Sequence, residues 1–157
     1  DEVVFQAMPA LRVMPPSTKA AGQRHHDAGY GHQPSQVNFW LPLCEARGAN
    51  TLWVEQLEAE VAATPLEGDF GVLHRFYGNE LFHFTKPNDT GTTRVSLDFR
   101  VCPGHLYDDD YGASKAANGR QKFFVGGFYA RARWQGDCWA VCEDGGGLLR
   151  GNANMDG

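Results

Sequence analysis

Turn-forming residues divide this chain throughout into short segments of strand-forming residues. Glycine occurs 19 times and proline 8 times, and the stretches between them are rich in Val, Phe, Trp and Tyr, which favour β-strands. Eight strands are predicted on this basis, at residues 3–7, 11–14, 36–44, 51–55, 71–76, 93–102, 123–134 and 139–143. The pattern, with few or no helices, predicts an all-β protein of the sandwich or jelly-roll type.

The chain of 157 residues has the size of one domain, which we place at residues 1–143. Residues 144–157 contain the run Gly145-Gly146-Gly147 and are expected to form a flexible tail. Residues 54–63 are rich in Glu and Ala, and they are predicted to form either the one helix of the domain or a long loop.

Charge and hydropathy narrow the range of partners. A net charge of −5 argues against nucleic acid, because binding to phosphates requires a basic face. The sequence has no run of about 18 apolar residues, so a membrane-spanning helix is not expected. We expect a soluble protein, cytoplasmic rather than secreted, although no targeting signal is readable and the oligomeric state is open. The four cysteines form no CxxC pair and are expected to be free thiols.

Three histidines and an aspartate lie within eight residues at the start of the stretch HHDAGYGHQPSQVNFWLPL. On an extended backbone His25 and Asp27 point to one side, whereas His26 points to the other. One imidazole and one carboxylate would then face the same point. A second histidine from elsewhere would complete the two-histidine, one-carboxylate triad that leaves three positions open on Fe(II). The alternative is a surface His-Asp pair that binds nothing.

A second stretch, HFTKPNDTGTTRVSLDFRV, begins at His83 and continues into an apolar strand. Alternation places four polar residues on one face of that strand, namely Arg94, Ser96, Asp98 and Arg100. These could form the solvated face of an edge strand, with Arg100 paired to Asp98 or to another acid. Alternatively, Arg94 and Ser96 form a clamp for a carboxylate. A metal triad beside such a clamp suits a cosubstrate that chelates the metal and ends in a carboxylate, as 2-oxoglutarate does.

Taken in order, these motifs resemble those of the Fe(II)/2-oxoglutarate-dependent oxygenases. The pattern H-x-T-x-x-N from His83 to Asn88, followed by Arg94, is similar to the phytanoyl-CoA hydroxylase-like branch. The strings YGHQPSQVNFWLPL, NTLWVE and NDTGTTRVSLDFRV are similar to the streptomycin-biosynthesis hydroxylase-like family. The resemblance covers residues 5–111.

The resemblance implies a double-stranded β-helix of the cupin-like kind, with the metal site at its open mouth. It implies that Fe(II) is bound by His25, Asp27 and His83, and that 2-oxoglutarate contacts Thr85, Arg94 and Ser96. The implied activity is a dioxygenase that uses O₂ and 2-oxoglutarate to hydroxylate a small polar metabolite, by analogy one similar to a sugar or a cyclitol.

Further residues are candidates for the walls of such a pocket. If the polar face of the strand at 36–44 is turned inward, Asn38 contacts the cosubstrate and Trp40 lines the pocket, although Trp40 is equally well explained as core. Tyr30, His32 and Glu55 are candidates for substrate binding. A structural hydrogen bond is an alternative role for His32, and an exposed strand is an alternative place for Glu55.

Two other functions fit a jelly roll with these residues. One is a cupin-like metal-dependent isomerase or epimerase, which would not need the carboxylate clamp of Arg94 and Ser96. The other is a carbohydrate-binding module without catalytic activity, in which Trp40, Trp53 and tyrosine side chains stack on sugar rings.

Overall fold

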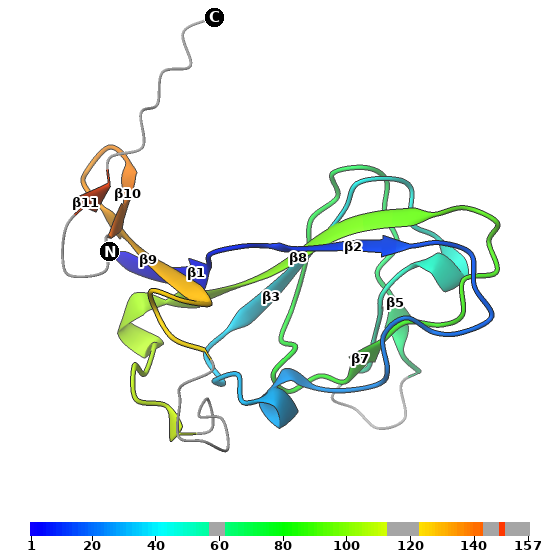
Figure 1. The fold of residues 1–157 in the computed structure, drawn as a ribbon, viewed down its shortest axis with the longest axis horizontal. Coiled ribbons are helices and arrows are strands. Elements are labelled where there is room, and N and C mark those ends of the chain that lie inside the picture. The colour runs from blue at the N-terminus through cyan, green and yellow to red at the C-terminus, as the bar shows by residue number, and fades with distance from the viewer. Residues whose placement is uncertain (57–61, 113–122, 143–147, 150–157) are drawn as a thin grey trace, which may run out of the picture.

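The computed structural model describes residues 1–56, 62–112, 123–142 and 148–149. Two antiparallel sheets form its framework (Figure 1). The larger sheet has the strand order β11-β10-β9-β1-β8-β3-β6, with β2 paired to β8, and the smaller has the order β5-β4-β7. The strand bounds are β1 Glu2–Gln6, β2 Ala10–Met14, β3 Val37–Pro42, β4 Trp53–Val54, β5 Thr64–Pro65, β6 His74–Phe76, β7 His83–Phe84, β8 Arg94–Pro103, β9 Tyr129–Trp134, β10 Trp139–Cys142 and β11 Leu148–Leu149.

The predicted all-β class is confirmed, since the antiparallel sheets form a sandwich of the cupin-like kind. The helical elements given within the described ranges are three short 3-10 turns: η1 Asp27–Tyr30, η2 Gly48–Asn50 and η3 Gly104–Leu106. The predicted helix or loop at 54–63 falls largely on residues 57–61, which lie outside the described residues. Of the predicted tail, the structure describes only β11, which pairs with β10.

Three strands were not predicted from the sequence. β5, β7 and β11 are each two residues long, so they are too short to show a periodicity and exist through pairing with β4 and β10. Conversely, the strand predicted at 123–134 begins only at Tyr129. The residues from Phe124 to Tyr129 form a turn. Gly126 has a φ of 94°, and the Tyr129 amide donates to the Phe124 carbonyl at 3.0 Å.

Strand β8 lies at the centre of the larger sheet. It pairs with β3 along one edge and with β1 and β2 along the other. The interpretation of residues 94–100 as an edge strand with a solvated polar face is therefore wrong. Arg94 and Ser96 are buried, at 3% and 0% exposure, and their face of the sheet is turned toward the smaller sheet, because Arg94 lines a cavity together with His83 of β7.

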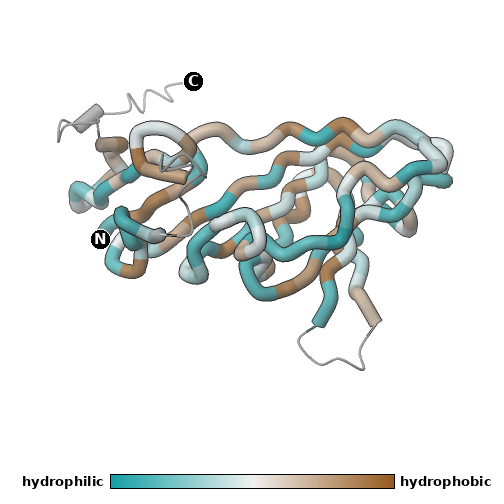
Figure 2. The backbone as a smooth tube through the Cα atoms, turned by 60° about the horizontal axis from the view of Figure 1, so that its bottom comes forward, coloured by the Kyte–Doolittle hydropathy of each residue, from teal (hydrophilic) through white to brown (hydrophobic). Residues whose placement is uncertain are grey.

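The outer face of the same sheet is apolar and only partly buried. It carries side chains from β3 and β8, namely Val37, Phe39, Leu41, Val95, Leu97, Phe99 and Val101. The rings of Phe39 and Phe99 stack across the two strands, with centroids 5.3 Å apart. Figure 2 shows hydrophobic and hydrophilic positions interspersed along the chain; on β8 the polar positions from Arg94 to Arg100 are inside and the apolar positions between them are outside.

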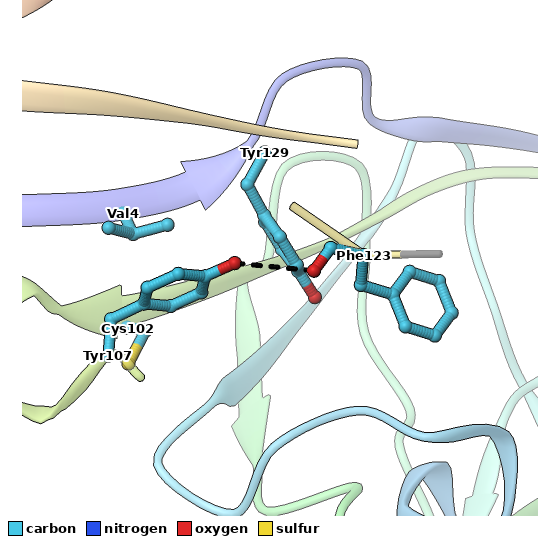
Figure 3. Packing of buried hydrophobic residues seen from close by; sticks show 5 residues of the cluster. All are labelled: Val4, Cys102, Tyr107, Phe123 and Tyr129. Carbon is cyan, nitrogen blue, oxygen red and sulfur yellow. Dashed lines mark hydrogen bonds between the residues drawn. The ribbon is translucent and has the colours of Figure 1, made fainter. Parts of the chain in front are cut away.

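Two apolar clusters hold the inner face in place. One consists of Val4, Cys102, Tyr107, Phe123 and Tyr129 (Figure 3), in which the Tyr107 hydroxyl donates to the Phe123 carbonyl at 3.5 Å. The other consists of Trp40, Ala46, Val54 and Phe76. All four cysteines are free thiols, as predicted. No helix in the described ranges is long and apolar enough to span a membrane.

The two faces of the larger sheet should respond differently to the same substitution. Val4 is fully buried, whereas Val13 is 61% exposed on the outer face. We expect Val4→Ala to lower the free energy of unfolding by about 2 kcal/mol, because two buried methyl groups are lost and a cavity is left. The matched control Val13→Ala should cost less than about 1 kcal/mol. Urea unfolding monitored by tryptophan fluorescence measures both, and equal losses would show that the faces are assigned incorrectly.

Candidate metal centre

His25, Asp27 and His83 lie together, with one potential ligand atom from each within 4.8 Å of the others. The two histidines come from segments far apart in the sequence that form an isolated antiparallel bridge. The His25 amide donates to the His83 carbonyl at 3.2 Å, and the His83 amide donates back at 2.8 Å. Residues that exchange both bonds are directly opposed and project from the same face. The two rings therefore lie with centroids 4.3 Å apart.

The backbone between His25 and Asp27 explains why Asp27 joins the pair and His26 does not. His26 is extended, with φ −120° and ψ 151°, so the residues on either side of it point the same way. Its own ring turns away and meets the ring of Phe82 edge-on, with centroids 4.8 Å apart. Asp27 then begins η1 and is anchored by its amide, which donates to the Gly78 carbonyl at 2.7 Å.

Backbone carbonyls set the orientation of both imidazoles. Nδ1 of His25 lies 2.7 Å from the Gln23 carbonyl, and Nδ1 of His83 lies 3.0 Å from the Leu81 carbonyl. Because a carbonyl oxygen only accepts, each Nδ1 carries the proton, and the neutral ring has its lone pair on Nε2. The Nε2 atoms lie 3.9 and 3.7 Å from Oδ1 of Asp27. Burial lowers the pKa of His83 and favours its neutral form.

The second carboxylate oxygen of Asp27 faces the opposite way and is held by two side chains. Asn38 Nδ2 donates to Oδ2 at 2.7 Å, Arg100 donates to it from Nε at 2.8 Å, and Nη2 of Arg100 forms an ion pair with it, also at 2.8 Å. Burial by itself would raise the pKa of Asp27, but Arg100 and Asn38 hold this pKa below its usual value. Asp27 is therefore a buried carboxylate with Oδ1 directed at the two histidines.

The sequence had suggested an ion pair between Arg100 and Asp98 as one alternative, but the two residues do not pair. Asp98 instead binds Arg12 of β2 at 2.7 Å, whereas Arg100 makes the buried contact with Asp27. The difference arises because Arg100 is directly opposite Asn38 in the β3–β8 register, and this position brings its guanidinium over the loop that carries Asp27.

The donor atoms suit a divalent transition metal. Two neutral imidazole nitrogens and one carboxylate oxygen are the ligands of the two-histidine, one-carboxylate sites that bind Fe(II) and leave positions open. In such sites the ligand atoms that face away from the metal are usually held by hydrogen bonds. Here Nδ1 of both histidines and Oδ2 of Asp27 are held in this way. The residues present therefore fit a metal ion of this kind.

A cavity of about 370 Å³ adjoins the cluster and is lined by residues of β2, β3, β7 and β8. His25, His83 and Arg94 are all on its wall. Arg94 is buried, and its Nη1 donates to the Asn50 carbonyl at 3.0 Å, but its Nε has no partner. None of the ion pairs within the described part of the chain includes Arg94. The cavity thus has a buried guanidinium that forms no ion pair, since Asp98, which is also on the cavity wall, is paired with Arg12.

The other residues predicted to contact the cosubstrate are buried nearby. Ser96 is completely buried and its hydroxyl has no partner, but it is not among the residues that line the cavity. Thr85 lines the cavity, but its Oγ1 already accepts the Gly22 amide at 2.7 Å. Asn38 also lines the cavity, yet both polar atoms of its amide are engaged, one with Asp27 and the other with the Gly78 amide at 3.2 Å.

The four residues predicted to bind substrate lie in different surroundings. Trp40 is 2% exposed and belongs both to the core and to the cavity wall. Tyr30 is exposed beside the ring of His25, with centroids 5.2 Å apart. His32 is buried outside the cavity wall, bonded to the Tyr129 hydroxyl at 2.9 Å. Glu55 forms an ion pair with Arg24 at 2.6 Å, also away from this wall. Tyr30 is also outside the cavity wall, so the cavity gives no support to substrate contacts by Tyr30, His32 or Glu55.

Two residues of the site, Arg100 and Gly78, were missed by sequence reasoning. Gly78 contacts Asp27 and Asn38 through its backbone, and a Cβ there would lie 2.5 Å from Asn38 Nδ2. Only glycine fits without displacing the amide that holds Asp27. The sequence signal for Gly78 was a turn, Tyr77-Gly78-Asn79, which gives no indication of this close approach.

The fold and site together define an all-β, cupin-like protein with a two-histidine, one-carboxylate cluster beside a cavity that contains a buried arginine. The chain is 39% identical over 108 residues to the streptomycin biosynthesis protein StrG of Streptomyces griseus. The match covers 69% of this chain and 51% of StrG, so the chain spans about half the length of the curated relative it matches. No protein-family profile matches the chain.

Solved structures of the protein ThoJ share the fold. A nickel complex of ThoJ, a non-heme monooxygenase, superimposes with a TM-score of 0.54 at 21% sequence identity, over 64% of this chain and 44% of that one. The apo form of ThoJ gives a TM-score of 0.52 at 19% identity, over 64% and 46% of the two chains. At these identities the likeness establishes the fold alone.

The cluster predicts which of the two neighbouring histidines is needed for metal binding. His25→Ala and His83→Ala should each abolish stoichiometric binding of Fe(II), because each removes one of three ligand atoms. His26→Ala should leave binding nearly unchanged, because its ring packs on Phe82. Anaerobic equilibrium dialysis with metal analysis measures the stoichiometry. An equal loss in His26→Ala and His25→Ala would contradict the assignment.

Proposed function

We propose that the protein is a non-heme Fe(II), 2-oxoglutarate-dependent dioxygenase that hydroxylates a small polar metabolite. One observation carries this proposal: a single cavity is lined both by His25 and His83 of the three-ligand cluster and by the buried guanidinium of Arg94, whose Nε has no hydrogen-bond partner. The overall reaction consumes one O₂ and one 2-oxoglutarate per substrate, and it yields succinate, CO₂ and the hydroxylated product. Its partners are these small molecules.

The metal half of the proposal is supported by the donor set. His25, Asp27 and His83 would hold the ion, and Fe(II) bound there would supply activation of O₂ coupled to oxidative decarboxylation of the 2-oxo acid. The protein keeps the three ligands in the required form before any ion arrives, because the Gln23 and Leu81 carbonyls fix the imidazoles and Arg100 keeps Asp27 ionised.

The cosubstrate half is supported by Arg94. A buried guanidinium requires a counter-charge or several hydrogen-bond acceptors, and Arg94 has only the Asn50 carbonyl in the described part of the chain. A carboxylate in the cavity could accept from the free Nε and so meet this requirement in a bidentate manner. The Ser96 hydroxyl, also buried without a partner, lies on the same face of β8 and offers a further donor.

The remaining wall of the cavity orients the ligands and excludes water. Trp40 is buried with its ring 5.5 Å from the Arg94 guanidinium, so it covers the charge with an apolar surface and strengthens its attraction for an anion. Thr85 holds the loop at Gly22 against β7 through its hydroxyl. No side chain of the cavity needs to act as a general base, because the reaction requires none.

The direct test is turnover of the cosubstrate without a substrate. Protein reconstituted anaerobically with Fe(II) is mixed with 2-oxoglutarate and O₂, and succinate is quantified against a His83→Ala control. Slow formation of succinate that is absent from the control supports the proposal. No succinate from a protein that binds Fe(II) stoichiometrically would favour the metal-dependent isomerase, and no metal binding would favour the carbohydrate-binding module.

Substitution of Arg94 should affect binding of the cosubstrate and not binding of the metal. Loss of a buried partner for a carboxylate costs about 2–5 kcal/mol, or roughly 30-fold to several thousand-fold in affinity. Arg94→Ala should therefore weaken 2-oxoglutarate binding by that factor and leave the Fe(II) affinity unchanged. Arg75→Ala, an exposed arginine of β6 outside the cavity, is the control. Calorimetric titration of the iron-loaded proteins measures both constants, and an unchanged constant in Arg94→Ala would place the carboxylate site elsewhere.

The identity of the relative supports a polar substrate. StrG is a streptomycin biosynthesis protein, and the cavity wall combines the Arg12–Asp98 ion pair with Trp40 and Phe76, which suits a hydroxylated ring better than a long acyl chain. We expect glycosyl or aminocyclitol compounds to stimulate 2-oxoglutarate turnover more than fatty acyl-CoA does. Succinate formation across a substrate panel measures this, and stimulation by acyl-CoA alone would contradict it.

A further inference from the structure

We infer that Arg100 is a positioning residue that restricts Asp27 to a single ligand atom and thereby keeps open the metal position that a chelating cosubstrate requires. The inference rests on the proposed function and concerns the same site. It follows from the unequal surroundings of the two oxygens of Asp27.

The two oxygens are divided between the metal cluster and the protein. Oδ1 lies 3.9 and 3.7 Å from the Nε2 atoms of the two histidines. Oδ2 accepts two hydrogen bonds, one from Asn38 Nδ2 at 2.7 Å and one from Arg100 Nε at 2.8 Å, and Nη2 of Arg100 lies 2.8 Å from it in an ion pair. These two hydrogen bonds use both lone pairs of Oδ2, so it has none left for a metal ion.

The register of the larger sheet produces this arrangement. Asn38 and Arg100 are directly opposed on β3 and β8, and residues so paired project from the same face. Their donors therefore converge on one point of the inner face, and Asp27 is brought to that point by its bond to the Gly78 carbonyl.

Arg100 and Asn38 are themselves held by further contacts. Nη1 of Arg100 donates to Oε1 of Gln6 at 3.2 Å, and Gln6 donates in turn to the Met8 carbonyl at 2.8 Å. The Asn38 oxygen accepts the Gly78 amide at 3.2 Å. Gln6 is 6% exposed, so the chain of contacts from Gln6 to Asp27 is buried, and the carboxylate cannot turn without breaking several hydrogen bonds.

The number of ligand atoms decides how many positions remain on the ion. Two imidazoles and one carboxylate oxygen would occupy three positions of a six-coordinate ion and leave three open. A 2-oxo acid that chelates through two atoms would need two of these, and O₂ would need one. If Asp27 bound through both oxygens, only two positions would remain, and chelation and O₂ binding would compete. Arg100 removes this competition by occupying Oδ2.

The change in metal affinity when Arg100 is removed distinguishes a positioning residue from a residue that only supports the fold. Arg100 is a permanent positive charge beside the cluster. Its removal lessens repulsion of a divalent ion and frees a second carboxylate oxygen, and both changes favour the metal. Arg100→Met should therefore keep or raise metal affinity while weakening 2-oxoglutarate. A residue that only supported the fold would weaken both.

Cobalt(II) is the probe, because its visible absorption reports the ligand number and geometry at a stable oxidation state. The full chain is titrated with Co(II) and then with 2-oxoglutarate, as the wild type and as Arg100→Met, Arg100→Lys and Arg94→Met. We expect Arg100→Met to bind Co(II) at least as tightly as the wild type, to change the Co(II) spectrum before any 2-oxoglutarate is added, and to weaken 2-oxoglutarate about tenfold or more. Arg100→Lys, which keeps a charged donor, should restore the wild-type spectrum.

Arg94→Met is the matched control, because it removes an arginine from the same cavity without touching Asp27. It should weaken 2-oxoglutarate and leave the spectrum of the Co(II) form unchanged. Thermal unfolding checks that each variant is folded, and Arg100→Gln replaces Arg100→Met if the latter is not.

Two results would overturn the role of Arg100: a wild-type Co(II) spectrum in the folded variant, or loss of Co(II) binding by it. A wild type that binds Co(II) but not 2-oxoglutarate would instead overturn the proposed function. In that case the Co(II) spectra of the wild type and of Arg100→Met would still show whether Arg100 restricts Asp27 to one ligand atom.

Discussion

The buried ion pair between Asp27 and Arg100 is the contact on which the rest of the site depends. It joins the loop after residue 22 to the central strand β8, and through Asn38 it includes β3 as well. Each of these charges would be costly to bury alone. Together they are stable, because Asp27 Oδ2 is bonded to Arg100 and Asn38, and Nη1 of Arg100 donates to Gln6. With Asp27 fixed in this way, its other oxygen and the backbone bridge between His25 and His83 bring three ligand atoms to one point.

Strand β8 reverses the usual arrangement of a sandwich over the stretch that borders the site. The inner face of β8 carries Arg94, Ser96, Asp98 and Arg100, whereas the apolar residues of the same strand face outward. A purely apolar inner face would bind neither a metal nor an anion. The polar face is tolerated inside because Arg100 and Asp98 each have an ion-pair partner, and because the two apolar clusters pack on either side of it. Arg94 and Ser96 are the exceptions, because Arg94 Nε and the Ser96 hydroxyl have no hydrogen-bond partner in the described part of the chain.

Much of the fold and the outline of the site could be predicted from local sequence. Turn residues and β-branched or aromatic runs were sufficient for the all-β class and for β1, β2, β3, β8 and β10, because these strands have enough residues to show alternation. The two-residue strands β5 and β7 could not be predicted, since their only support is pairing with β4. Alternation also predicted that the His26 side chain points away from those of His25 and Asp27. It could not decide between the edge-strand and clamp interpretations of Arg94, because both have the same pattern of residues.

The sequence by itself determined the periodicities: which side chains share a face, which segments are extended and where they turn. Those properties follow from the geometry of one strand and require no knowledge of its neighbours. Only the tertiary structure decided which face is inside, that His83 lies opposite His25, and that Arg100 holds Asp27 and not Asp98. These outcomes depend on register between segments up to 73 residues apart. Register is set by the packing of the whole sheet, to which no single stretch of sequence gives access.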